Sequence, residues 1–157
     1  MVNNNRLEQY LSKLGLNDPV DTNETRLFDL HKAQFYKIPF ENLTIQLGQQ
    51  VKTDFDSLFN KLVINDRGGY CFELNELMRH MLIQSGFWAK PLLARVHLST
   101  PPSGKTHQIT LVKLGDKYWI MDVGFGAGGP RYPMPLEEGT VSRHETASYR
   151  FIKRSPW

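Results

Sequence analysis

The sequence has a single cysteine and no long apolar run, and both absences narrow its chemistry. One cysteine in 157 residues excludes an intramolecular disulfide and a cysteine-rich zinc site. No segment is long and apolar enough to span a bilayer, and residues 1–10 are too polar for a secretory signal peptide. We therefore expect a cytoplasmic protein that binds no metal and does not act at a membrane.

The chain also has little net charge. The formal net charge is +3, and 40% of residues are hydrophobic while 22% are charged, which is typical of a folded domain. Lysine and arginine are scattered along the chain and form no basic stripe, so we expect no nucleic-acid partner. The length suits one domain, or two small lobes that share a core.

The first half of the chain is patterned for helices. Apolar residues recur at helical spacing, Asn5 and Glu8 resemble a capping box, and Thr53 is placed to cap a later helix. Alternating apolar residues at 43, 45 and 47 predict a short extended segment. We expect helices over residues 5–14, 23–36, 53–62 and 71–85.

The second half is patterned for strands, which are rich in β-branched and aromatic residues. Gly115 and Asp116 form a turn signal between two of them. The pattern predicts an α+β fold, with a helical lobe over 1–86 and an incomplete antiparallel β-barrel lobe over 87–157. The expected strands are 91–98, 107–114, 118–123 and 149–152, and no partner is visible after the last one.

Cys71 is the first candidate for chemistry. It follows Gly-Gly-Tyr at a predicted helix start, where unpaired N–H groups and the helix dipole favour a thiolate and could hold an oxyanion. The carboxylates of Glu73 and Glu76 oppose a second anion, so a thiolate there needs a cationic partner, such as a histidine. The alternative is a small buried cysteine that only packs.

His107 and Asp122 are the candidates for that partner and its support. His107 opens one predicted strand, and Asp122 lies near the end of the next. If residues 115–116 form a two-residue turn, both side chains share one face as diagonal neighbours; a three-residue loop would put them on opposite faces. Asp122 would then fix the imidazole tautomer and stabilise the imidazolium. The alternative is an aspartate that caps local backbone.

Several blocks of the sequence resemble, in order, the arylamine N-acetyltransferase family. The longest is Arg-Gly-Gly-Tyr-Cys-Phe-Glu-Leu-Asn, which is similar to the family's nucleophile signature. The resemblance covers the N-terminal two-thirds or so of the proteins in this family. Their third domain, an α/β segment, has no expected counterpart in this sequence. The matching blocks are 38–43, 67–75, 107–112 and 122–126, with Pro-Met-Pro-Leu at 133–136.

The resemblance implies a papain-like triad of Cys71, His107 and Asp122. It implies ping-pong transfer of an acetyl group from acetyl-coenzyme A to the nitrogen of an arylamine or arylhydrazine, through an acetyl-Cys71 intermediate and without a metal. A role in xenobiotic metabolism is implied as well. It also gives Arg67 and Glu41 an ion pair that braces the cysteine loop; two unpaired surface charges are the alternative.

The resemblance also implies contacts to the substrates. Phe40 and Phe125 would line an apolar slot for the aromatic amine, and Gly126 and Gly128 would lie beside the acyl donor. Core packing is the plain alternative for the phenylalanines, and a simple turn is the alternative for the glycines.

Two other functions suit the same residues. A papain-like cysteine hydrolase would cleave an acyl donor without any amine. A catalytically impaired form would instead bind partners, or self-associate as a homo-oligomer through an exposed edge of the β lobe.

Overall fold

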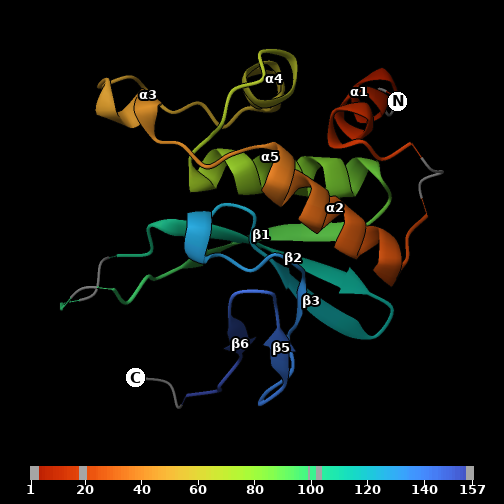
Figure 1. Ribbon diagram of the computed structural model, residues 1–157, viewed down its shortest axis with the longest axis vertical. Coiled ribbons are helices and arrows are strands. Elements are labelled where there is room, and N and C mark those ends of the chain that lie inside the picture. Colours follow the sequence, from red (N-terminus) through yellow and green to blue (C-terminus); the bar gives the residue numbers. More distant parts are fainter. Residues whose placement is uncertain (1–3, 18–20, 99, 102–103, 155–157) are drawn as a thin grey trace.

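A computed structural model describes residues 4–17, 21–98, 100–101 and 104–154, and in it the helices precede the main sheet. A single π-helical turn, η1 (Asn60–Ile64), extends α4. Figure 1 shows α5 lying between the sheet on one side and α1 and α4 on the other. The helices are α1 (Asn4–Leu14), α2 (Glu24–Lys37), α3 (Leu43–Gln46), α4 (Phe55–Phe59) and α5 (Cys71–Gln84).

The main sheet is antiparallel, with strand order β1-β2-β3-β4 and β1 at one edge. A separate hairpin, β5 with β6, lies beyond it (Figure 1). The mixed, antiparallel architecture is confirmed, and neither sheet closes on itself among the described residues. A barrel and the division at residue 86 stay predictions. The strands are β1 (Trp88–Ala94), β2 (His107–Leu114), β3 (Lys117–Met121), β4 (Met134–Pro135), β5 (Val141–Arg143) and β6 (Ser148–Arg150).

The buried side chains of α5 join the helices to the sheet. The apolar ones are fully buried and belong to the same core cluster as the inward residues of β2 and β3. Because the helix is packed along its length against two layers, its first residue, Cys71, is held at a fixed place relative to the strands. The buried apolar residues of α5 are Leu74, Leu77, Met78, Met81 and Leu82.

Local signals placed several elements correctly. Asn23 caps α2, its side chain accepting the backbone N–H of Arg26 at 2.8 Å. The helix predicted to start near Cys71 starts there. Two predicted caps were wrong: α1 begins at Asn4, which leaves Asn5 inside the helix, and Asp54, one residue after Thr53, caps α4.

The predicted extended segment at 43–47 is wrong. Residues Leu43–Gln46 form the short helix α3, and all three alternating side chains are exposed, Leu47 by 70%. Alternation indicates a strand only where one face packs on a core, and here no core lies beneath. Instead, the Glu41 carboxylate accepts the backbone N–H of Leu43 at 2.6 Å, which favours the turn.

The first and last strands also differ from expectation. β1 runs from Trp88 to Ala94 rather than over 91–98, because its pairing with β2 ends where Ala94 meets His107. The tail strand, β6, covers Ser148–Arg150 rather than 149–152, and it pairs with β5, which precedes it in the chain. Within the described part of the chain, no helix is both long and apolar enough to cross a membrane.

Candidate active site

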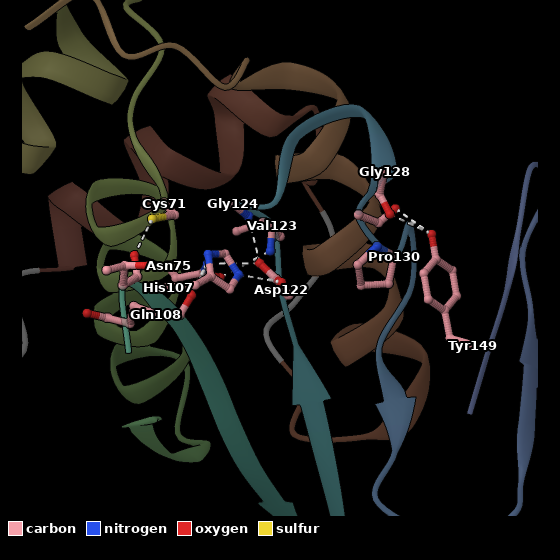
Figure 2. A network of polar contacts seen from close by, with 12 residues as sticks. Cys71, Asn75, His107, Gln108, Asp122, Val123, Gly124, Gly128, Pro130 and Tyr149 are labelled. Carbon is pink, nitrogen blue, oxygen red and sulfur yellow. Dashed lines mark hydrogen bonds and ion pairs between the residues drawn. The ribbon is translucent and has the colours of Figure 1, made fainter. Parts of the chain in front are cut away.

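His107 and Asp122 are in contact. β2 and β3 are joined by the expected two-residue turn, with Leu114 opposite Lys117, and this register puts both side chains on one face. His107 Nε2 lies 2.7 Å from Asp122 Oδ2, and each residue is 6% exposed (Figure 2). So short a contact between imidazole and carboxylate is a charge-assisted hydrogen bond. The predicted pairing is therefore present, and its catalytic role stays a prediction.

Asn75 fixes the aspartate, although sequence reasoning did not single it out. Its Nδ2 donates to the carbonyl of Gln108 at 2.7 Å and to Asp122 Oδ1 at 3.0 Å, and its Oδ1 accepts the N–H of Val123 at 3.1 Å. Asp122 Oδ1 also accepts the N–H of Gly124 at 3.0 Å. Asn75 thus ties α5 to β2 and to the segment that follows β3 (Figure 2). Its position one helical turn after the cysteine was the available signal.

Cys71 is buried yet borders a cleft. The residue is 3% exposed, and it lines a cavity of about 260 Å³ together with His107. Its Sγ lies 3.8 Å from the carbonyl oxygen of Thr106, the residue that precedes His107. Cys71, His107 and Asp122 thus lie close together, at the start of α5, the start of β2 and just after the end of β3 (Figure 2).

The electrostatics of this site favour a charged imidazole. Burial lowers the pKa of His107, but the hydrogen bond that its ring donates to Asp122 and its electrostatic interactions with Asp122 and Cys71 outweigh this effect and raise the pKa from the usual 6.5 to about 9. The ring is therefore protonated at neutral pH. That His107 is the cationic partner of a thiolate at Cys71 stays a prediction.

The raised pKa of His107 predicts a pH-dependent stability. A group with a raised pKa stabilises the fold in its protonated form, fully so below the unfolded value of 6.5, and the effect is lost as the pH rises through about 9. We expect His107→Gln to lower the melting temperature more at about pH 6 than at about pH 10. Thermal unfolding followed by circular dichroism measures this difference, and an equal loss at both pH values would contradict it.

The carboxylates near the cysteine have cations of their own. Lys61 Nζ lies 2.8 and 2.9 Å from the two oxygens of Glu73, and Glu73 also accepts the backbone N–H of Tyr70 at 2.9 Å. Glu76 pairs with Arg79. The repulsion of a thiolate expected from the sequence is therefore largely compensated, because each carboxylate is neutralised within its own ion pair.

Phe40 and Phe125 both line the cleft, as the family resemblance implies. They are 42% and 37% exposed, so neither is plain core packing. The Phe125 ring stands edge-on to the ring of His107, with centroids 5.3 Å apart. An apolar wall thus faces the imidazole, and contact with a substrate stays a prediction.

The predicted ion pair of Arg67 and Glu41 is present. Arg67 Nη2 lies 2.8 Å from Glu41 Oε1, and Lys61 Nζ approaches the same oxygen at 3.5 Å. The backbone N–H of Glu41 donates to the carbonyl of Gly69 at 2.9 Å. The pair therefore braces the backbone segment 67–70, which leads into Cys71.

Gly126 and Gly128 begin and end the 3₁₀ turn η2 (Gly126–Gly128) after the aspartate. Gly126 has a φ of 77°, a left-handed conformation that glycine adopts without strain. Among the described residues that line the Cys71 cleft, neither glycine is found. Their contact with an acyl donor stays a prediction.

Two residues that sequence reasoning passed over hold this glycine-rich loop. Burial lowers the pKa of His31 to about 4, so its ring is neutral, and Nε2 donates to the carbonyl of Pro130 at 2.9 Å. The hydroxyl of Tyr149 in β6 lies 3.0 Å from the carbonyls of both Gly128 and Gly129 (Figure 2). Neither residue sits in a recognisable motif, because both contacts link segments far apart in the sequence.

Comparison with known proteins agrees with this geometry. A family model described as N-acetyltransferase matches residues 25–156. Arylamine N-acetyltransferase of Escherichia coli is 37% identical over 149 residues. The structure of the Salmonella typhimurium arylamine N-acetyltransferase superposes with a TM-score of 0.91 at 36% identity, covering 96% of this chain and 56% of that one. The chain belongs to the arylamine N-acetyltransferase family.

The match is unequal in length. The alignment with the Escherichia coli relative includes 94% of this chain but only 53% of the relative. The chain therefore spans about half of that relative's length, rather than the two-thirds expected. The Mycobacterium marinum arylamine N-acetyltransferase, solved in complex with CoA, has a TM-score of 0.87 at 33% identity and covers 94% of this chain and 57% of its own. The likeness to the N-acetyltransferases therefore concerns the part that carries the candidate site.

Proposed function

We propose that this chain transfers an acetyl group from acetyl-coenzyme A to the nitrogen of an arylamine or arylhydrazine. The observation that carries the proposal is the position of His107, which is hydrogen-bonded to Asp122 and lines the same cleft as Cys71. Family membership supplies the reaction class, and the Mycobacterium marinum relative was solved with CoA. The cleft beside the sulfur supplies an apolar place for an aromatic ring.

The proposed reaction has two balanced steps. The Cys71 thiolate attacks the thioester carbonyl, the new S–C bond forms, and the bond to coenzyme A breaks as its sulfur takes the proton of His107. The amine nitrogen then attacks the acetyl carbon, Cys71 leaves as thiolate, and neutral His107 accepts the amine proton. Backbone N–H groups in the first turn of α5 would stabilise the oxyanion of either tetrahedral intermediate.

Intact-mass measurement tests the proposal. Incubation with acetyl-coenzyme A alone should add one acetyl group to the chain, and later addition of 4-methylaniline should remove it and yield the N-acetylated amine. Cys71→Ala should acquire no acetyl group. A folded wild-type chain that binds coenzyme A without becoming acetylated would contradict the proposal. Loss of the acetyl group to water at the same rate without amine would indicate the hydrolase instead.

Three further expectations accompany this function. A role in xenobiotic metabolism, a cytoplasmic location and self-association as a homo-oligomer through an exposed edge of the β lobe stay predictions. Sedimentation velocity at several concentrations measures the self-association, because an oligomer formed through a strand edge should dissociate on dilution.

A further inference from the structure

A second cavity adjoins the Cys71 cleft, and neither step of the proposed transfer uses it. Its volume is about 280 Å³, against about 260 Å³ for the cleft. Phe40 lines both cavities. The other residues that line the second one are Phe35, Ile38, Val123, Gly126, Ala127 and Arg131.

One backbone segment and one side chain separate the two cavities. Within residues 123–127, Gly124 and Phe125 line the cleft, and the other three residues line the second cavity. The Phe40 ring completes the wall, since it lies 3.7 Å from the place where a side chain at Gly126 would begin. Removing or turning this ring would join the two spaces.

The Phe40 ring is the movable part of the wall. The backbone segment is fixed by two hydrogen bonds, from the N–H of Val123 to Asn75 and from the N–H of Gly124 to Asp122. The ring is 42% exposed, and its centroid is 6.1 Å from that of Tyr70. Exposed side chains change rotamer on picosecond to nanosecond timescales.

The size and lining of the second cavity fit an aromatic ring. An apolar cavity of about 150 Å³ is enough to bind benzene, and this one is larger. The guanidinium of Arg131 lies 5.0 Å from the centroid of the Phe35 ring and so offers a flat surface for stacking. Because Glu145 lies 3.7 Å from Arg131 and offsets its charge, a neutral ring suits the cavity better than an anionic one.

We propose that the cavity behind Phe40 is a subsite for the second ring of fused aromatic amines, entered when the Phe40 ring turns aside. The inference rests on the proposed function, which places the amino group and first ring in the Cys71 cleft. The second ring would then lie between Phe35 and the segment 123–127.

Equilibrium binding of two amines tests the subsite. The dissociation constant of 2-naphthylamine is measured from its own fluorescence, and that of 4-methylaniline by competition. Phe40→Ala should shift the ratio of the two constants about tenfold in favour of the two-ring amine. Ala127→Phe, which fills the second cavity, should reverse that shift when added to Phe40→Ala.

Leu43→Ala is the matched control, since it removes an exposed apolar side chain that lines neither cavity. An unchanged ratio in Phe40→Ala, or a shift that persists when Ala127→Phe is added, would overturn the inference. If the double variant does not fold, Ala127→Leu replaces it. Failure of the proposed function would appear differently, as absence of acetylated amine with the binding ratios as expected.

Discussion

Asp122→Asn is expected to lower the rate of acetyl transfer about 10³- to 10⁴-fold, mainly in kcat. Oδ1 of Asp122 accepts two donors, the Nδ2 of Asn75 and the N–H of Gly124, so the amide oxygen of the variant must take this place. Its NH₂ group then faces Nε2 of His107 and forces the ring proton onto the other nitrogen. The tautomer is wrong and the imidazolium loses its counter-charge, although the fold is kept.

Single-turnover transfer to 4-methylaniline measures the loss in kcat, and NMR titration of the imidazole measures its cause. The pKa of His107 should fall clearly below about 9 in Asp122→Asn, because the hydrogen bond and charge of the carboxylate both raise it. Asp116→Asn in the exposed turn between β2 and β3 is the matched control. A variant that keeps more than about a tenth of the rate would remove Asp122 from the mechanism.

The part of the site that could be predicted is the part set by local rules. A two-residue turn fixes the register of β2 and β3, and the register alone decides that His107 and Asp122 share a face. Likewise Gly-Gly-Tyr before an apolar helical pattern fixed the start of α5, which puts Cys71 in its first turn. These inferences need only neighbours along the chain.

The part that could not be predicted depends on contacts between distant segments. The alternation at 43–47 looked like a strand because the sequence does not show that no core lies beneath it. Asn75 looked like one more helical residue, yet it bonds to β2 and to the segment that follows β3. Lys61 had no evident partner until the fold brought it to Glu73. Each of these facts is tertiary, and no local propensity encodes it.

Gly124→Ala should both destabilise the fold and impair the site, because position 124 is where the end of β3 meets the start of α5. An added Cβ would lie 2.8 Å from Cα and 3.0 Å from the carbonyl oxygen of Cys71, and 2.6 Å from Nδ2 of Asn75. The first two atoms are backbone and cannot rotate away. The helix and strand must therefore separate, at a cost of roughly 3 kcal/mol in the free energy of unfolding.

The separation also weakens the reaction, since a shift of about 1 Å between reacting groups can cost about 10²-fold in rate. Urea unfolding measures the stability, and acetylation of Cys71 by acetyl-coenzyme A measures the rate. Gly104→Ala is the matched control, because an added Cβ there meets only Thr106 Cγ2 at 4.0 Å. Stability and acetylation equal to those of the control would contradict this prediction. They would show that the close contact between the start of α5 and the end of β3 is not what aligns the sulfur of Cys71 with the imidazole of His107.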